Sequence, residues 1–439
     1  MRDSGVEFLG EVPSHWEVQP AVTLARVLTS TVDKKSYDGE QSVKLCNYTD
    51  VYYSDQIVDS SDFMVATATS EQIAKFSVRA GDVPFTRDSE TADDIGIPSY
   101  VPKDLPGTVY GYHLSIFRPI DRRRGRFLKY LLESDYAKAY FEAKTPGVTR
   151  VGLGQATIRY FRAPTPPLEE AVAIADYLDR ETAQIDAFIA KNEELITLLT
   201  ERRAAATFRL VTGLDGTEVP PKPVKADWFR VVPQTWDVAP LYTMAKTFAG
   251  GTPKSDAEEY WTDDDDDGTE WIAIGDMRAV QAGYPHSGRR VTAAGLDAGG
   301  LTPRSGPLVL FAMYASVGEV AMLRRPAVWN QAILGIRTDP SRLNERYLYW
   351  TLLALRSKLG IYFRSNTQDN LNAAQVRGLR LPVPPLVEQQ AIADQLEETW
   401  ASVDEAIATA HRGVELARER RAALISAAVT GKIDVGVAV

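Results

Sequence analysis

The sequence predicts a multidomain α+β protein in which one half of the chain repeats the other. Three observations predict this fold class. A block that begins at Pro166 returns 218 residues later, at Pro384. Each copy of the block is typical of one long helix, and the segment before each copy mixes short strand-like runs with turns and a helical run. A repeat of this length implies an internal pseudo-two-fold axis, so that one chain mimics a dimer.

The two copies of the block match at four places with one constant offset and therefore without a gap. The matching stretches are Pro166-Pro167-Leu168 and Pro384-Pro385-Leu386, Ile174-Ala175-Asp176 and Ile392-Ala393-Asp394, Glu201 to Ala205 and Glu419 to Ala423, and Val211-Thr212-Gly213 and Val429-Thr430-Gly431.

The signals at the two ends of the first copy are those of a helix. Two prolines precede it, where a missing N–H costs nothing, and Gly213 follows its last turn, where a left-handed cap is needed. No Pro or Gly interrupts the segment from Leu168 to Thr212, which can therefore run for about 65 Å.

Apolar residues at heptad spacing predict that the two long helices pair as an antiparallel coiled coil. The expected seam of the first helix is Ile174, Leu178, Ile185, Phe188, Leu195 and Leu199, and that of the second is Ile392, Leu396, Val403, Ala406, Ala410, Gly413, Ala417 and Leu424. Phe188 is expected to face Ala410, and Ile185 to face Gly413, because large residues facing small ones fill the space. Glu181 and Asn192 interrupt the seam. The alternative is two separate amphipathic helices, but a helix of this length is longer than one domain can cover.

The two globular segments, here called the first and second heads, are expected to be mixed α/β domains. In the first head, strands are predicted at Ser42–Cys46, Ile57–Val58, Val83–Phe85 and Leu114–Phe117, and one helix at Phe127–Ala143 with a counterpart at Tyr347–Leu359. The phrase Pro13 to Pro20 returns as Pro233 to Pro240, so the repeat extends into the heads. The predicted order is a lead (1–14), the first head (15–165), a helix (166–213), a proline-containing extended linker (214–230), the second head (231–383), a helix (384–431) and a tail (432–439).

Composition excludes several classes of protein. Hydrophobic content of 44% and charged content of 25% are ordinary for a globular protein, and no run of 18 apolar residues predicts a membrane span. The N-terminus has no apolar signal segment, and the single Cys46 excludes internal disulfides. The four histidines are scattered without cysteine partners. We expect a cytoplasmic protein with no membrane contact and no metal or cofactor of its own.

Charge is acidic overall but unevenly distributed. A net charge of −10 argues against a nucleic-acid binder, which usually has a basic face. Arginines nevertheless gather between the long helices, at Arg122 to Arg126, Arg289-Arg290, Arg324-Arg325, Arg377 and Arg380. A locally basic surface can hold phosphate, although any single arginine is more simply a solvated surface charge. The run from Asp263 to Asp267 would repel DNA and is expected to point away from it.

No catalytic motif is found. An adenine methyltransferase needs Asn or Asp before Pro-Pro and an aromatic residue, whereas the Pro-Pro pairs here follow Thr165, Val219 and Val383. Gly152-Leu153-Gly154 and Gly250-Gly251 lack the strand–loop–helix setting of a cofactor loop, and there is no G-x-x-x-x-G-K-[ST] loop. The chain is therefore interpreted as non-catalytic by itself.

Three stretches carry a family likeness. They are the opening phrase from Asp3 to Trp16, Gly250-Gly251-Thr252-Pro253 followed by Tyr260-Trp261, Trp271-Ile272 and Asp276, and Pro384-Pro385-Leu386 followed by Glu388 to Ala393. In this doubled order, the chain resembles the specificity subunit of a type I restriction–modification system over nearly its whole length. The first copy departs from the family's pattern at Glu169 to Val172, and the first head has no Gly-Gly-Thr-Pro opening.

The resemblance implies a division of labour. The heads would be target recognition domains, each reading one half of a split sequence in double-stranded DNA. The long helices would be the conserved spacer and would dock two copies of the modification subunit, which carries S-adenosylmethionine and the adenine-N6 methylation chemistry. A restriction (motor and nuclease) subunit can join the complex.

Loops that follow strands are the candidates for DNA contact, because Arg, Asn, Gln, Ser and Thr reach phosphates and base edges. The candidates are Thr86, Arg87, Thr149 and Arg150 in the first head, and Tyr314, Ser316, Asn366, Thr367, Gln368 and Asn370 in the second. The simpler interpretation is that these loops are polar turns that face water. A second hypothesis for the whole chain is a coiled-coil adaptor whose heads bind proteins rather than DNA, as the acidic net charge would allow.

Overall fold

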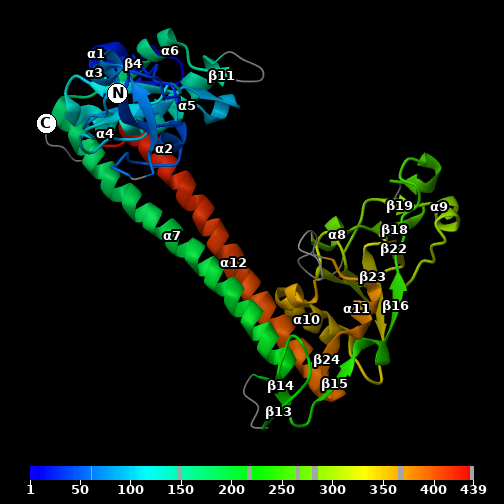
Figure 1. The fold of residues 1–439 in the computed structure, drawn as a ribbon. Coiled ribbons are helices and arrows are strands. Elements are labelled where there is room, and N and C mark those ends of the chain that lie inside the picture. Colours follow the sequence, from blue (N-terminus) through cyan, green and yellow to red (C-terminus); the bar gives the residue numbers. More distant parts are fainter. Residues whose placement is uncertain are drawn as a thin grey trace. The chain divides into compact units, whose positions relative to one another are not determined.

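The computed structural model describes residues 1–60, 62–145, 151–214, 220–263, 267–278, 285–363 and 370–435. These residues divide into two compact units (Figure 1). The first unit is Met1–Glu193 with His411–Val439, and the second is Glu194–Ala410. The division runs through both long helices, so each unit holds one head together with part of each helix.

The two long helices are α7 (Leu168–Thr212) and α12 (Leu386–Val429). In the first unit, Ile174 and Leu178 of α7 share a buried core with Ile425 of α12. In the second unit, Leu210 of α7 shares a core with Leu396 of α12. Each helix therefore begins where the other ends. This confirms the predicted antiparallel pair, and α7 and α12 lie side by side within each unit (Figure 1).

The predicted seam holds at the helix ends and is wrong in the middle of both helices, since Ala406 of α12 was expected in the seam but is exposed. Ile185 is buried, and Leu199, Ile392 and Val403 are half-buried, while Leu396 and Ala410 are buried. Phe188 and Leu195 were expected in the seam but are 49% and 45% exposed, and Ile189 and Ile196, one residue later, are half-buried instead. The physical reason is that an α-helix of 3.6 residues per turn drifts out of a strict seven-residue repeat.

The predicted facing of Ile185 and Gly413 is also wrong. The side chain nearest to a Cβ placed on Gly413 is that of Phe188, whose ring carbon Cζ lies 3.6 Å away. A ring this close to glycine still follows the large-against-small rule, although with a different partner.

The first head contains two three-stranded sheets. The order β4-β10-β7 is antiparallel, and in the order β6-β5-β9 the strand β5 is parallel to β9. The elements are β1 (Arg2–Asp3), β2 (Glu11–Val12), β3 (Glu17–Pro20), α1 (Ala21–Leu24), β4 (Ala25–Thr29), β5 (Gln41–Cys46), α2 (Tyr48–Tyr52), β6 (Met64–Ala68), α3 (Ser70–Phe76), β7 (Val83–Thr86), β8 (Asp88–Ser89), η1 (Ala92–Asp94), β9 (Thr108–Tyr110), β10 (Leu114–Pro119), η2 (Arg122–Arg124), α4 (Gly125–Glu133), α5 (Asp135–Ala143), β11 (Val151–Gly152), α6 (Gln155–Arg159) and β12 (Arg162–Thr165).

The second head repeats this plan with larger sheets. The order β16-β23-β20-β21 is antiparallel, and in β17-β19-β18-β22 the strand β18 is parallel to β22. The elements are β13 (Pro221–Pro223), β14 (Val231–Pro233), β15 (Asp237–Pro240), η3 (Leu241–Thr243), β16 (Ala245–Ala249), η4 (Glu258–Tyr260), β17 (Trp261–Thr262), β18 (Thr269–Ile272), α8 (Ile274–Arg278), β19 (Arg290–Val291), α9 (Ala293–Ala298), β20 (Leu308–Ala312), β21 (Val320–Leu323), β22 (Ala327–Trp329), β23 (Ile333–Thr338), α10 (Glu345–Leu355), η5 (Arg356–Tyr362), α11 (Ala373–Gly378) and β24 (Arg380–Val383).

Three of the four predicted strands are confirmed, as β5, β7 and β10. Ile57–Val58 is not a strand, and only the neighbouring Gln56 forms an isolated bridge, to Tyr100. The predicted helix Phe127–Ala143 is two helices. Ser134 takes an extended conformation (φ −68°, ψ 152°) and its hydroxyl accepts from Ala137 N, which ends α4 and caps α5. The counterpart α10 ends at Leu355 and continues as the 3₁₀ helix η5.

The opening phrase of each head anchors a long helix in the same way. The indole N–H of Trp16 donates to Glu170 Oε1 at 2.9 Å, and that of Trp236 donates to Glu388 Oε2 at 2.8 Å. Both ring systems are almost fully buried. The helix that ends on each head comes from the other half of the repeat. Gly431, after α12, packs on Pro13 and Trp16, and Gly213, after α7, packs on Pro233 and Trp236.

No helix within the described ranges is both long enough and apolar enough to cross a membrane.

Candidate nucleic-acid interface

In the first head, a backbone hydrogen bond joins the candidate segment after β7 to the residues that follow the second candidate loop. The carbonyl of Arg87 accepts from Leu153 N at 2.8 Å. The strand β8, just after Arg87, pairs antiparallel with β11, with Val151 opposite Ser89. Arg87 is half-buried, and its guanidinium makes no ion pair with a described residue. The segments after β7 and before α6 therefore form one surface.

The prediction that Thr86 contacts DNA is wrong. Its side chain is fully buried in β7, and its hydroxyl accepts from Ile97 N at 3.0 Å. A hydroxyl that is already engaged inside the domain cannot reach a base edge. Thr86 therefore has a structural role, holding the backbone that follows β7.

The second head repeats the same arrangement. The carbonyl of Met313 accepts from Leu371 N at 2.9 Å, which brings the loop containing Tyr314 and Ser316 beside Asn370. Tyr314 is 38% exposed. Ala315 has φ of +59°, a left-handed conformation that costs energy for a residue with a Cβ and is found most often at functional turns.

Five of the predicted contact residues, Thr149, Arg150, Asn366, Thr367 and Gln368, lie outside the described residues. The middle of the acidic run Asp263 to Asp267 lies outside them as well. The structure therefore tests neither group.

Three of the four arginines in the run Arg122 to Arg126 of the first head are engaged within the protein. Arg123 pairs with Asp121 and Glu169, and Arg124 donates to the carbonyl of Pro166 at 3.0 Å. Arg126 pairs with Asp176 and Asp179 at 2.7 and 2.6 Å. These arginines join η2 and α4 to the start of α7, which weakens the expectation that they hold phosphate.

A cavity of about 500 Å³ opens in the first head between α2 and β8. Its lining is aromatic and acidic, with Tyr48, Tyr52, Asp88, Asp94 and His113 among its residues. The hydroxyl of Tyr52 donates to Asp94 Oδ2 at 2.9 Å, and this bond raises the pKa of Tyr52 to about 12. Carboxylates at this density repel phosphate. No group of three or more His, Cys, Asp or Glu side chains in the described part of the chain is placed to hold a metal ion.

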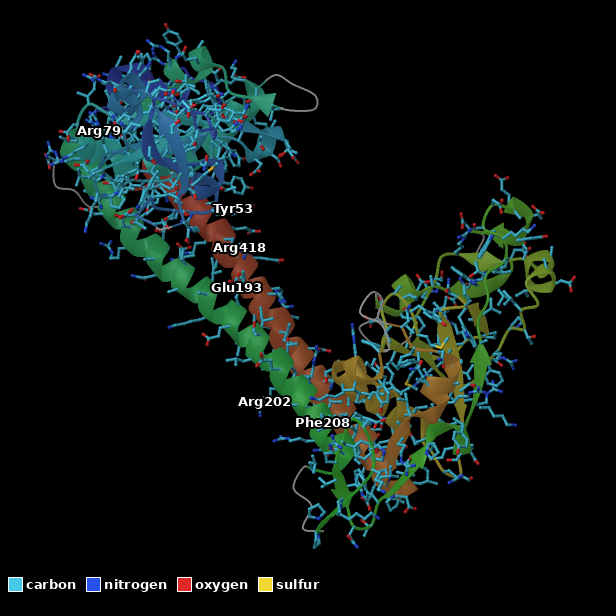
Figure 2. All side chains as sticks on the ribbon, viewed as in Figure 1. Tyr53, Arg79, Glu193, Arg202, Phe208 and Arg418 are labelled. Carbon is cyan, nitrogen blue, oxygen red and sulfur yellow. The ribbon has the colours of Figure 1, made fainter. Side chains whose placement is uncertain are left out.

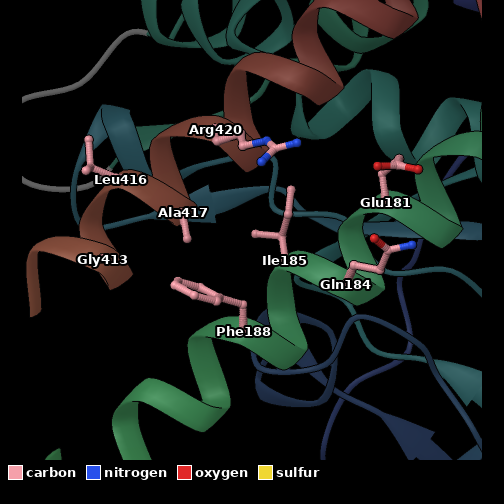
Figure 3. A pocket seen from close by; sticks show the side chains of 8 residues that line it. All are labelled: Glu181, Gln184, Ile185, Phe188, Gly413, Leu416, Ala417 and Arg420. Atoms are coloured by element: carbon pink, nitrogen blue, oxygen red, sulfur yellow. The ribbon is translucent and has the colours of Figure 1, made fainter. Parts of the chain in front are cut away.

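The long helices carry an apolar groove in the first unit (Figure 3). It has a volume of about 440 Å³ and is lined by Glu181, Gln184, Ile185, Phe188, Gly413, Leu416, Ala417 and Arg420. Leu416 is 65% exposed and Phe188 is 49% exposed, so large apolar side chains face water here. Exposed apolar surface of this kind makes the groove a candidate interaction site.

The second unit has an apolar patch at the repeat-equivalent position. Leu198 corresponds to Leu416 and is 54% exposed, and Leu195 corresponds to Gly413 and is 45% exposed. The bulk that Phe188 supplies in the first unit is thus supplied by Leu195 in the second, where the residue equivalent to Phe188 is Ala406.

Ion pairs join the helices beside these patches. In the first unit, Arg418 donates to Glu193 at 2.8 Å, and the two residues extend from neighbouring helices (Figure 2). Arg421 pairs with Asp186 at 3.0 Å in the same unit, and Arg203 pairs with Asp404 in the second. The carboxylate in each pair is 45% exposed or more, and ion pairs near the surface contribute little stability each but favour one register.

Comparison with known proteins gives a consistent result. Residues 233–407 match the family model of the type I restriction modification DNA specificity domain. Over 97% of the chain, and 96% of the relative, the sequence is 22% identical to the putative type I restriction enzyme MjaX specificity subunit of Methanocaldococcus jannaschii. A stretch of 108 residues, covering 25% of this chain and 23% of the relative, is 32% identical to the type I restriction enzyme EcoBI specificity subunit of Escherichia coli.

Solved structures show the same fold. One chain from a study of complex assembly and conformational transition of the type I R-M system aligns with a TM-score of 0.70 at 18% identity, covering 96% of this chain and all of the other. The HsdS subunit from Thermoanaerobacter tengcongensis aligns with a TM-score of 0.58 at 16% identity, covering 99% of this chain and all of the other. Residues 233–407 therefore match the type I specificity domain, and the whole chain shares the fold of the solved HsdS subunit.

In the two long helices, sequence reasoning missed Leu198 and Leu416. Both lie outside the predicted heptad seam and therefore received no role. Their signal was available, because a large apolar residue stands off the seam at the same place in both copies of the repeat.

Proposed function

We propose that this chain is the DNA-recognition subunit of a type I restriction–modification complex and that it reads a two-part target, one part with each head. One observation carries the proposal. Both heads hold the segment after β7 or β20 against the residues that follow the second candidate loop through an equivalent backbone hydrogen bond, from Leu153 N to Arg87 O and from Leu371 N to Met313 O. Two similar but non-identical reading surfaces suit a target with two different halves.

The proposed contact residues are those of the two candidate loops in each head. In the first head they are Arg87, Thr149 and Arg150, and in the second Tyr314, Ser316, Asn366, Thr367, Gln368 and Asn370. Their donor and acceptor groups match base edges and phosphate oxygens in a groove.

The long helices are proposed to dock two modification subunits and to set the gap between the half-targets. The groove at Phe188 and Leu416 and the patch at Leu195 and Leu198 support two docking positions. In this proposal the chain itself catalyses nothing. S-adenosylmethionine and the adenine-N6 methylation belong to the modification subunit, a restriction subunit can join, and the complex works in the cytoplasm.

Mapping of methylated adenines on genomic DNA, with and without this chain, tests the proposal. We expect a split motif that depends on the chain. Arg87→Ala should relax only one half of the motif, and Tyr314→Ala only the other. Methylation at an unsplit motif, or the same change from both variants, would contradict two-headed reading.

The acidic net charge of −10 favours one alternative function, that of an adaptor whose heads bind proteins. A salt titration of duplex binding by the assembled complex separates the two functions. Phosphate contacts make affinity fall steeply with salt, whereas an adaptor would give neither a slope nor a sequence preference.

A further inference from the structure

The second head carries a group of residues, here called the Arg304 patch, that consists of Lys246, Phe248, Arg304 and Arg337, and only two of its three cations have counterparts in the first head. The guanidinium carbon of Arg304 lies 3.8 Å from the centre of the Phe248 ring, and that of Arg337 lies 5.5 Å from it. Lys246 stands directly opposite Arg337 in the antiparallel pair of β16 and β23. Two of the three cations therefore lie against one aromatic ring, and Lys246 stands opposite one of these two.

None of these cations makes an ion pair with a described residue. Arg337 donates to the carbonyl of Ser305 at 2.8 Å, which fixes its position without neutralising its charge. The carboxylate of Asp339, two residues further on, accepts from the backbone N–H and the hydroxyl of Ser341 in a turn. Like charges directly opposite each other in a sheet are destabilising, so this arrangement costs stability unless an anion offsets it.

In the first head, the equivalent strand pair is β4 and β10, and there the arginine equivalent to Arg337 is neutralised by a carboxylate. Arg26 and Arg118 stand opposite each other there, at the positions of Lys246 and Arg337. Arg118, however, donates to the carboxylate of Asp82 at 2.7 and 2.8 Å, and Asp82 is almost fully buried.

The register of the strands identifies the residue that replaces Asp82. Val83 pairs with Phe117 in the first head, and Val309 pairs with Ile336 in the second. The position equivalent to Asp82 is therefore Leu308, which is apolar and fully buried. The carboxylate that neutralises Arg118 has no counterpart at this position beside Arg337.

Two further differences add to the patch. Arg304 N donates to Ala327 O at 3.0 Å, as Val78 N donates to Thr108 O in the first head, so an arginine stands where the first head has valine. Phe248 stands where the first head has Leu28, since both occupy the fourth position of equivalent strands. A ring beneath a guanidinium leaves its N–H edge free to donate to a planar or tetrahedral anion.

We propose that the Arg304 patch binds the phosphodiester backbone of DNA next to the half-target read by the second head. This inference rests on the proposed DNA-reading function and adds a contact that the first head does not make. Arg304 and Arg337 supply forks of N–H donors that suit phosphate oxygens, and Lys246 adds a point charge.

The position of the patch makes it a backbone contact rather than a base contact. Leu308 begins β20 beside the patch, and Ala312 ends β20 just before the loop of Tyr314. A strand of five residues separates the two sites by about 17 Å. Phosphate contacts hold the register of a protein on the duplex and carry no base information, so the patch is expected to affect all sequences alike.

The test is a salt titration of duplex binding by the full chain assembled with its modification subunit, using a random-sequence duplex and the mapped target. Between about 50 and 200 mM salt, the double variant Arg304→Gln/Arg337→Gln should lower the slope of log K against log salt by roughly 2, with equal loss on both duplexes. The double variant Arg304→Lys/Arg337→Lys keeps both charges and should keep the slope. Arg342→Gln is the matched control, because its guanidinium in the same head donates to the carbonyl of Thr243.

The possible results distinguish a failure of this inference from a failure of the proposed function. If wild type gives a steep slope and Arg304→Gln/Arg337→Gln keeps it, the patch does not bind phosphate and this inference fails alone. If that variant instead loses the modification subunit with its slope unchanged, the patch binds an acidic protein surface, which also overturns the inference. If wild type shows no salt-dependent duplex binding, the proposed function fails and takes this inference with it.

Discussion

At the scale of single residues, one buried carboxylate decides what an arginine does. Asp82 accepts from Arg118 and from the hydroxyl of Tyr110 at 3.0 Å, and burial raises the pKa of Tyr110 well above its usual value. These three groups form a closed polar network inside the first head. In the second head the equivalent of Asp82 is Leu308, and the arginine remains available for a ligand.

Asp82→Ala should destabilise the first unit strongly. Removing one partner of a buried ion pair leaves the other charge uncompensated and costs about 3–5 kcal/mol. Thermal unfolding should show a clear fall in the Tm of the first unit. Asp59→Ala is the control, because Asp59 is 71% exposed in its pair with Lys44 and such pairs contribute about 1 kcal/mol or less. Equal effects from the two variants would contradict the network.

Glu133 should make the stability of the first unit depend on pH. Burial raises its pKa, although Lys129 and Arg421 oppose the shift, and the carboxylate of Asp55 faces the same group and adds to it. With a folded pKa above the unfolded one, Glu133 lowers stability as pH rises from the ordinary glutamate pKa through the raised one. Glu133→Gln removes this loss, so the Tm of the variant relative to wild type should increase over that pH interval. A difference that is constant with pH would contradict the raised pKa.

At the scale of elements, the long helices were predictable in type and extent because their two copies share one uninterrupted pattern. The break between two helices inside Phe127–Ala143 was not predictable, because neither Pro nor Gly marks it. A serine hydroxyl caps the second helix there and competes with continuation of the first. The prediction of the seam in the middle of α7 was wrong because a strict heptad ignores the drift of an α-helix with 3.6 residues per turn. Ile189 and Ile196, each one residue after a predicted position, are half-buried there.

The apolar residues on the long helices should behave as two independent docking positions. Leu416→Asp should remove one bound modification subunit, Leu198→Asp the other, and the double variant both, because a buried charge destroys an apolar contact. The mass of the assembled complex in solution measures this. Ile120→Asp, which alters a 73% exposed side chain on the first head, should leave the mass unchanged. Loss of both partners from either single variant would contradict independent positions.

At the scale of the whole molecule, the chain is two units, and each is completed by an element from the other half of the repeat. Much of this followed from the sequence, since the repeat identifies the second helix as the partner of the first. The candidate site was only partly predictable. The joining of Arg87 to Leu153 and the grouping of Arg304 with Arg337 depend on backbone pairing between distant segments, which local pattern does not contain.

The two helix-ending glycines should control the two units separately. Gly431 (φ +71°) lies where a Cβ would come within 2.3 Å of Pro13, and Gly213 (φ +70°) where one would come within 2.4 Å of Pro233. Gly431→Ala should lower only the unfolding transition of the first unit in calorimetry, and Gly213→Ala only that of the second. Gly39→Ala, with similar φ but open space around it, should cost only the backbone strain of about 1–2 kcal/mol. A shift of both transitions by either helix-end variant would contradict separate units.

The placement of Ile425, Ala428 and Val429 in the core of the first head has a consequence for biosynthesis. The ribosome delivers that head early but the end of α12 late, so the nascent first head lacks one wall of its interior during most of translation. The second unit, Glu194–Ala410, is contiguous and can close as soon as it emerges. Folding on the ribosome should therefore run against the usual order, with the later-made half finishing first.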